Sequence, residues 1–185
     1  IKPVVMATVP RLWEAIHDGF FQALKKMSSK KQKLIKFLIS NSSVFKRSLR
    51  KIRNLDINHI TLKSKIPLLL FLIGRYPLHK LSTIFLWPKI LRQLCGEKLK
   101  FPINGGGALP EHVDLFFESL GVDVLVGYGL TETSPVLTCR RRELNVRGSS
   151  GQPLAFTEIK IVNDDKKKIL KFREVGKILV KGPQV

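Results

Sequence analysis

Apolar residues near the start of the chain recur with the period of an α-helix. They are spaced three or four positions apart, at Leu12, Ala15, Ile16, Phe20, Ala23, Leu24 and Met27. This stripe predicts one amphipathic helix over residues 9–27, and Pro10 suits its first turn, where a backbone N–H is not needed. Lys30–Arg53 continues as a basic amphipathic segment, which predicts one or more further helices.

Residues 54–100 are mixed in character and contain three prolines, Pro67, Pro77 and Pro88. Proline lacks the backbone N–H and clashes with the preceding turn, so it usually ends or kinks a helix. The prolines therefore predict short helices separated by breaks. The longest apolar runs, Ile66–Ile73 and Leu81–Leu91, are shorter than the roughly 20 residues that span a bilayer.

From Lys100 onward the apolar runs have the length of strands and are separated by glycine loops. Lys100–Asn104 predicts a strand leading into Gly105–Pro110, followed by a helix with Gly121 just past its end. Val122–Val126 predicts a buried strand that leads into Gly127–Thr133. Together these elements form a βαβ-type unit, and ligands of open parallel sheets gather at the carboxyl ends of the strands.

The end of the chain is typical of an antiparallel sheet. Phe156–Val162 and Gly176–Val180 predict strands, and Asn163–Lys168 predicts a charged turn. The predicted fold class is therefore α/β, with a helical and basic first half, then the βαβ unit, then a β-rich tail.

Charge is distributed unevenly along the chain. Of 185 residues, 33 are Lys or Arg and 14 are Asp or Glu, a net charge of +19. Residues 1–103 hold 21 basic and 4 acidic residues, against 12 and 10 in the remainder. The basic half can be a solvated helical surface, a surface for anionic membranes, since apolar residues interleave with the charges, or a nucleic-acid surface, for which no recognised motif is present. Charge alone does not decide between them.

The cysteine, histidine and acidic residues limit the kinds of site that the sequence can form. Cys95 and Cys139 make neither a disulfide framework nor a zinc-binding pattern, which favours an intracellular protein. The histidines share no spacing typical of metal ligands, and His17 is expected to be structural. Ordinary surface charges are expected at four acidic positions: Glu97, Glu111, Glu118 and Asp123.

Two glycine-containing loops are the candidate sites. Three consecutive glycines, Gly105–Gly107, allow close backbone approach to a nucleotide base or an anion, although they also suit a simple tight turn. In Tyr128–Glu132 an aromatic ring can stack on a base, a hydroxyl can donate to a phosphate and a carboxylate can hold Mg²⁺. A purely structural role is equally open for this segment on these grounds.

Several stretches together resemble the adenylate-forming enzymes, in the form used by long-chain acyl-CoA synthetases. Tyr128–Val136, YGLTETSPV, is similar to the core motif of that family. The other similar segments, in matching order and spacing, are Val9–Glu14 (VPRLWE), Gly105–Pro110 (GGGALP), Gly151–Pro153, Glu158–Val162 and Val180–Val185. The pattern is most similar to the cyanobacterial and plastid branch, which loads fatty acids onto acyl carrier protein or coenzyme A.

The resemblance implies an ATP- and Mg²⁺-dependent ligase that activates long-chain fatty acids through an acyl-adenylate. It implies Thr131 and Glu132 as catalytic residues, with Glu132 as the Mg²⁺ ligand. The implied nucleotide-binding residues are Gly105, Gly106, Gly107, Ala108, Tyr128, Gly129, Leu130 and Thr131. We expect no nucleic-acid partner, and a cytoplasmic location, or a plastid one in a plant or alga, with possible peripheral membrane contact through the basic face.

The resemblance also implies parts that this sequence lacks. The family's upstream phosphate loop and its downstream ribose-binding Asp and mobile domain with the catalytic Lys are absent from it. We therefore expect residues 1–185 to be an internal part of the adenylation domain, inactive alone, with a basic helical part (1–103) and a nucleotide-binding α/β part (104–185). The alternatives are a non-catalytic basic binding module, or a ligase for aromatic acids, against which the VPRLWE segment argues.

Overall fold

The computed structural model describes residues 4–57, 60–96, 99–165 and 168–185. Its helices in chain order are α1 (Pro10–Lys25), α2 (Ser29–Ile52), α3 (Leu62–Phe85), α4 (Trp87–Leu94), α5 (Glu111–Ser119) and the 3₁₀ turn η1 (Thr131–Thr133). Its strands are β1 (Val5–Thr8), β2 (Phe101–Asn104), β3 (Leu125–Tyr128), β4 (Thr138–Cys139), β5 (Gln152–Pro153), β6 (Glu158–Val162) and β7 (Lys177–Lys181). The chain is therefore α/β, as predicted.

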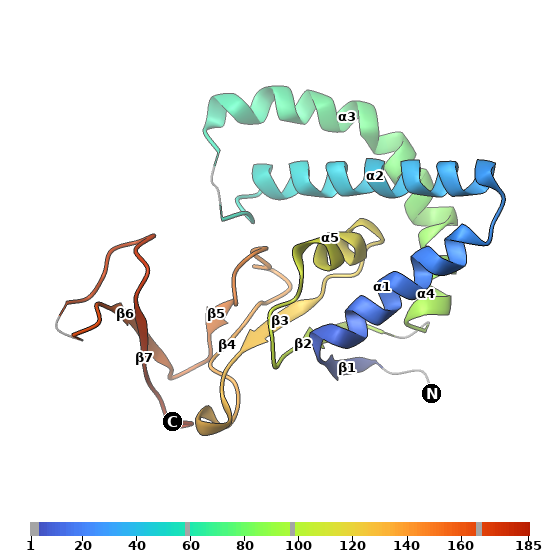
Figure 1. The fold of residues 1–185 in the computed structure, drawn as a ribbon. Coiled ribbons are helices and arrows are strands. Elements are labelled where there is room, and N and C mark those ends of the chain that lie inside the picture. The colour runs from blue at the N-terminus through green and yellow to red at the C-terminus, as the bar shows by residue number, and fades with distance from the viewer. Residues whose placement is uncertain (1–3, 58–59, 97–98, 166–167) are drawn as a thin grey trace.

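Within these described residues, the first five strands form one sheet in the order β1-β2-β3-β4-β5. β1, β2 and β3 are parallel, and β4 and β5 add antiparallel pairs. The β2–α5–β3 segment confirms the predicted βαβ unit (Figure 1). β1 was not predicted from the sequence, because its four residues become a strand only by pairing with β2, more than ninety positions later.

The strand predicted at Val122–Val126 begins later than expected. Gly121 has a φ of +94° and ends α5 in the left-handed conformation, as its position predicted. The backbone N–H of Val122 still donates to the carbonyl of Phe117 at 2.9 Å, so this residue belongs to the turn after the helix. Pairing with β2 starts at Leu125, opposite Ile103.

The helix α1 lies within its predicted range and α2 begins one residue before its predicted range, at Ser29, but α3 corrects the sequence prediction. α3 runs without interruption through Pro67 and Pro77, where breaks were expected. Both prolines are exposed, so the carbonyl groups that lose their helical partner can be hydrated, and packing of α3 along α2 holds the helix together (Figure 1). Only Pro88 lies at a boundary, near the start of α4.

The main core lies between α5 and the N-terminal helix. Trp13 and Phe117 are fully buried and their rings meet edge to face, with centroids 4.9 Å apart. Trp87 and Val113 belong to the same cluster. His17 contacts the ring of Phe116 at its margin, which agrees with the structural role expected for it. The VPRLWE segment therefore anchors α1 on the βαβ unit.

The tail is an antiparallel pair, β6 with β7, as predicted (Figure 1). β6 begins at Glu158 rather than at Phe156, because Phe156 has a φ of +62° and belongs to a turn. Residues 166–167 of the predicted turn lie outside the described residues. No described helix is both long and apolar enough to cross a membrane.

A buried histidine joins α2 to α3 and predicts sensitivity to acid. His79 is hydrogen-bonded through Nδ1 to the Ser42 hydroxyl at 3.0 Å and stacks on Phe45. Burial, assisted by the nearby charge of Lys46, lowers the pKa of His79 to about 4. The unfolded chain, with an ordinary histidine pKa near 6.5, therefore takes up the proton first as the pH falls. Stability should decline between about pH 6.5 and 4, by up to about 3 kcal/mol.

Urea unfolding of wild type and His79→Gln at pH 7 and 4.5 measures this effect. The variant should lose less stability on acidification than wild type, whereas His17→Gln, at the margin of the core, serves as the control and should behave like wild type. Equal acid sensitivity in all three proteins would show that His79 does not titrate in this way.

Candidate functional site

The two glycine loops leave neighbouring strands at the same edge of the sheet. β2 and β3 are parallel, with Asn104 opposite Val126, so the segments after Asn104 and Tyr128 emerge side by side. The fully buried Asn104 holds the first loop, because its Nδ2 donates to the carbonyl of Gly107 at 3.0 Å. Both loops therefore leave the ends of parallel strands, as the predicted βαβ unit implied.

The first loop lies against the start of α1. Gly106 has a φ of +71°, a conformation that favours glycine. A Cβ at Gly107 would lie 3.2 Å from the Cγ of Pro10, so this loop and the VPRLWE segment are in close contact. Gly106, Gly107 and Ala108 themselves are exposed, which leaves their backbone open to a ligand.

The second loop also depends on a glycine. A Cβ at Gly129 would overlap the carbonyl oxygen of Pro135 and lie 2.8 Å from the Cα of Val136. The hydroxyl of Thr133 accepts a hydrogen bond from the Leu130 N–H and donates to the Leu130 carbonyl, both at 2.9 Å. These contacts fold the segment directly after Tyr128 back on itself.

Both loops line one cavity of about 600 Å³. This volume lies within the range of small-molecule sites. Its described lining residues are Gly106, Gly107, Ala108, Leu109, Val126, Gly127, Tyr128, Gly129, Arg140, Gly148, Ser149 and Ser150. The cavity thus brings together five of the predicted nucleotide-binding residues, from loops that are twenty positions apart.

The other predicted residues lie outside that lining. Gly105 sits at the end of β2, where its N–H donates to the Thr8 carbonyl at 2.9 Å. Leu130, Thr131 and Glu132 continue from the second loop into η1 and are exposed. Their exposure leaves the hydroxyl of Thr131 and the carboxylate of Glu132 available to groups that extend beyond the cavity.

The third wall of the cavity was missed by the sequence analysis. It consists of residues 148–150 and the side chain of Arg140, which is buried. Arg140 donates from Nε to the Ser149 carbonyl at 2.7 Å, and Thr138 donates to the Ser150 carbonyl at 2.8 Å. The polar, glycine-flanked sequence RGSSG was the available signal, but nothing local placed it opposite Tyr128.

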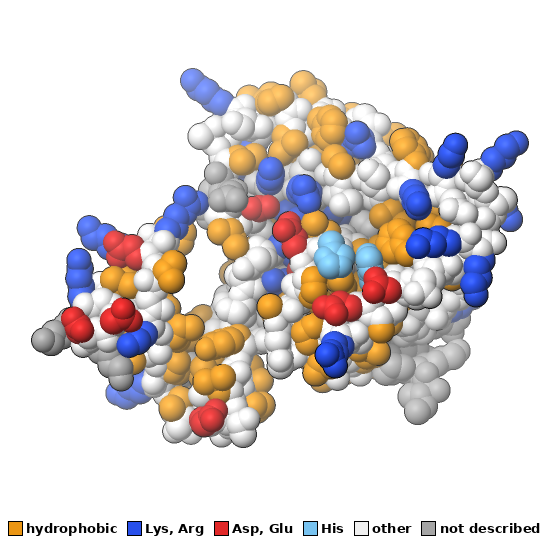
Figure 2. All heavy atoms as spheres, in the orientation of Figure 1, with side chains coloured by type: hydrophobic (Ala, Val, Ile, Leu, Met, Phe, Trp, Pro, Cys, Tyr) orange, Lys and Arg blue, Asp and Glu red, His pale blue; other side chains and the backbone are white. Residues whose placement is uncertain are grey.

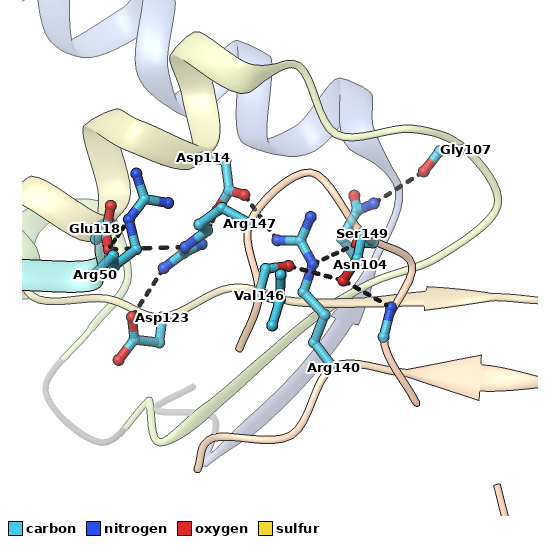
Figure 3. A network of polar contacts seen from close by, with 11 residues as sticks. Arg50, Asn104, Gly107, Asp114, Glu118, Asp123, Arg140, Val146, Arg147 and Ser149 are labelled. Atoms are coloured by element: carbon cyan, nitrogen blue, oxygen red, sulfur yellow. Dashed lines mark hydrogen bonds and ion pairs between the residues drawn. The ribbon is translucent and has the colours of Figure 1, made fainter. Parts of the chain in front are cut away.

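A buried ion network supports this wall (Figure 3). Arg140 Nη1 donates to Asp114 Oδ2 at 2.8 Å, and Arg147 Nη1 pairs with the other oxygen of Asp114. Arg147 also pairs with Asp123 at 2.8 Å. On the far side, Arg50 of α2 lies 3.2 Å from Glu118. The network therefore links the basic helical half of the chain to the wall of the cavity.

The network corrects one expectation about surface charges, that for Glu118. Glu118 is buried, and burial raises its pKa while Arg147 and Arg50 oppose that shift. Burial likewise lowers the pKa of Arg50. Asp123 is half exposed but is paired with Arg147. Glu111 is exposed as expected, and Glu97 lies outside the described residues.

The cavity suits a flat, uncharged group. Arg140 is the only charged side chain among the described lining residues, and its guanidinium is already paired with Asp114 and Ser149. The rest of the lining offers backbone groups, two serine hydroxyls and the ring of Tyr128. Backbone groups and an aromatic ring can bind a nucleotide base by hydrogen bonding and stacking.

A metal ion at this site would take most of its coordinating atoms from a bound phosphate compound and water. Within the described part of the chain, no three His, Cys, Asp or Glu residues cluster closely enough to hold a metal ion. Glu132 offers a single exposed carboxylate beside the cavity. Mg²⁺ commonly binds one or two protein carboxylates together with substrate phosphates and water, so Glu132 fits such a role.

Comparisons with known proteins find relatives among AMP-binding and acyl-activating enzymes. A model of the family described as AMP-binding enzyme matches residues 1–185. The probable acyl-activating enzyme 16, chloroplastic, of Arabidopsis thaliana is 34% identical over 100% of this chain and 26% of its own length. The long-chain-fatty-acid–[acyl-carrier-protein] ligase AEE15, chloroplastic, of the same plant is 33% identical over the same shares. The chain thus spans about a quarter of the length of these relatives.

Solved structures similar to this chain include a complex with AMP. The o-succinylbenzoate coenzyme A synthetase of Bacillus subtilis in complex with AMP is 33% identical over 54% of this chain and 26% of that chain. Its TM-score of 0.45 is too low for its geometry to be transferred.

Proposed function

We propose, from the premise that this chain belongs to the family of AMP-binding enzymes, that it builds the nucleotide site of a ligase for long-chain fatty acids. Family membership confirms the resemblance indicated by the sequence motifs. The observation that carries the proposal is the joining of Gly106–Ala108 and Tyr128–Gly129 in one cavity at the ends of parallel strands. The names of the two plant relatives support acyl activation, and that of AEE15 supports a long-chain fatty acid as the substrate.

Each site residue then has a role in the proposal. Tyr128 stacks on or flanks the adenine of ATP, and Gly105–Ala108, Gly129 and Leu130 form the backbone walls around it. Thr131 donates a hydrogen bond to the α-phosphate. Glu132 would hold Mg²⁺, and the bound ion would supply positive charge beside the phosphates.

The proposed reaction has two steps. A carboxylate oxygen of the fatty acid attacks the α-phosphorus of ATP, and the bond to pyrophosphate breaks, which gives acyl-AMP. A thiol sulfur then attacks the acyl carbon, forms a thioester and releases AMP. The thiol belongs to coenzyme A or acyl carrier protein, because relatives are named for each acceptor.

The proposal also covers the domain organisation, location and partners of the protein. Residues 1–185 form a part of the adenylation domain, with 1–103 as its basic helical part and 104–185 as its nucleotide-binding part. The protein resides in the cytoplasm, or in the plastid of a plant or alga, touches membranes peripherally and has no nucleic-acid partner. The chloroplast location printed for two plant relatives supports the plastid alternative.

Pyrophosphate release tests the proposal directly. A full-length protein containing this chain is incubated with palmitate, ATP and Mg²⁺, as wild type and as Glu132→Gln. The variant should release pyrophosphate at least about 100-fold more slowly, since it lacks the carboxylate that holds the metal. The control is Glu111→Gln, which changes an exposed glutamate of α5. This variant should retain wild-type activity.

Two results would contradict the proposal in different ways. Full activity of Glu132→Gln would place the metal on another residue while keeping the ligase. No pyrophosphate release with any fatty acid would reject the ligase, and release with aromatic acids alone would assign a different adenylating enzyme.

A further inference from the structure

The turn η1 has two side chains that face outward and one that faces inward. Thr131 and Glu132 are exposed, whereas Thr133 is only 6% exposed. A 3₁₀ helix has three residues per turn, so successive side chains point about 120° apart. Thr133 is therefore the one side chain of η1 that can hold the turn against the protein.

The backbone of η1 needs such support. A 3₁₀ helix has poor hydrogen-bond geometry, and this one has only three residues. Its backbone bonds run from the Thr133 N–H to the Leu130 carbonyl at 3.0 Å and from the Ser134 N–H to the Thr131 carbonyl at 3.3 Å. Ser134 ends the turn with a φ of +48°, a conformation that is uncommon for residues other than glycine.

The hydroxyl of Thr133 supplies the support. It binds both backbone groups of Leu130, the residue directly before the turn: the N–H donates to it and the carbonyl accepts from it, each at 2.9 Å. The side chain of Leu130 is 52% exposed and adds little packing of its own. One buried hydroxyl thus joins the two ends of η1.

The two outward side chains have no comparable contacts. Among the residues that the structure describes, neither the Thr131 hydroxyl nor the Glu132 carboxylate makes a hydrogen bond or an ion pair. Figure 2 shows acidic surface over this turn, below β3 and β4 in the view, with hydrophobic and uncharged side chains around it. The backbone of η1 alone therefore sets where these two groups lie.

The cavity beside η1 is held by different contacts. Tyr128 pairs with Thr138 of β4, and its carbonyl accepts from the Leu137 N–H at 2.8 Å. The loop after β2 has its own contact through the side chain of the last residue of that strand. Loss of the Thr133 hydroxyl would also introduce no clash, unlike a side chain at Gly129, which lies between the cavity and η1. The cavity should therefore keep its shape when η1 loosens.

We propose that Thr133 is a positioning residue, which directs the Thr131 hydroxyl and the Glu132 carboxylate toward the phosphates and Mg²⁺ and takes no part in binding the base. The inference rests on the proposed function, because it requires the phosphates and the metal ion to meet this turn. It divides the nucleotide site into a cavity for the base and a separately held turn for the phosphates and the metal.

Binding measurements on the full-length protein test this division. Adenosine has the base but no phosphate, and ligand-detected NMR gives its affinity. Calorimetry with α,β-methylene-ATP, with and without Mg²⁺, gives the gain in affinity that the metal supplies. In Thr133→Val, which keeps the shape but loses the hydroxyl, this gain should shrink at least about fivefold, as expected for one lost hydrogen bond. The affinity for adenosine should stay within about twofold of wild type.

Three further variants make the result specific to the hydroxyl. Thr133→Ser retains it and should keep the wild-type gain. Thr133→Cys, with a weaker donor and acceptor, should lie between wild type and Thr133→Val, and it provides the same test if the valine variant does not fold. The control is Thr83→Val in α3, which removes a hydroxyl that donates to the His79 carbonyl at 2.9 Å and should behave like wild type.

The outcomes that contradict the inference differ from those that contradict the nucleotide site. An undiminished gain from Mg²⁺ in Thr133→Val and Thr133→Cys would show that η1 is held without the hydroxyl. Equal losses of adenosine affinity and of the gain would make Thr133 a general support of the site rather than a positioning residue. Absence of adenosine and ATP-analogue binding in wild type would reject the nucleotide site itself, and this inference with it.

Discussion

Replacing Gly129 by alanine is expected to slow adenylation by the full-length protein about 100-fold or more. The added methyl group would overlap the Pro135 carbonyl oxygen, and the neighbouring Val136 Cα is only 2.8 Å away. Both obstacles are backbone atoms, which cannot move aside as a flexible side chain can. The turn after β3 must therefore open, which displaces Tyr128 from the cavity wall, and misplacement by about 1 Å can cost 100-fold in rate.

Pyrophosphate release at varied ATP concentration measures this effect in the full-length protein. Both a higher KM for ATP and a lower kcat are expected, because in the proposed site the same segment binds the base and the phosphates. Gly19→Ala in α1 is the matched control, since its Cβ would meet nothing within 4 Å. An active Gly129→Ala variant with an unchanged KM for ATP would show that this turn does not bind the nucleotide.

The second large effect is expected from Asp114→Asn, which should lower the free energy of unfolding by about 3–5 kcal/mol. Asp114 is buried and accepts from both Arg140 and Arg147, so the substitution removes the carboxylate paired with Arg140 and leaves Arg147 with only its pairs to Asp123 and Glu118. Removing one partner of a buried ion pair typically costs this much. Because Arg140 also holds the carbonyl of Ser149, the wall of the cavity should loosen as well.

Denaturant unfolding of the full-length protein measures the loss, with Glu111→Gln as the control on the same helix. That control changes an exposed side chain and should stay within about 0.5 kcal/mol of wild type. If Asp114→Asn unfolds at the wild-type denaturant concentration, the two arginines obtain their stabilisation elsewhere and the network does not support the wall.

Local pattern was sufficient for the elements that depend on neighbouring residues. The stripe of α1, the unit β2–α5–β3 and the end of α5 at Gly121 were all predicted, because helical spacing and a glycine cap act within a few positions. The same reasoning found both loops of the cavity, since parallel strands place their carboxyl ends at one edge of the sheet.

Elements that depend on distant partners were not predicted. β1 becomes a strand only by pairing with β2. The cavity wall at Ser149 is held by Arg140, and Arg140 is held in turn by Asp114, which is 26 positions away. Pairing of this kind leaves no periodic signal in the sequence. The prediction of breaks in α3 was wrong for another reason. Proline usually ends a helix, but here the exposed backbone around each proline can be hydrated, and the helix packs on α2.

The position of β1 has a consequence for how the chain behaves outside a longer protein. β1 is the end strand of its sheet, and among the described strands it pairs with β2 alone. Its free side presents unpaired backbone N–H and C=O groups, beside the exposed Val4 and Val5. Such an edge is a template onto which another strand can add. In a longer protein that strand can extend the sheet, whereas in a preparation of these residues alone a second copy can take its place and begin aggregation.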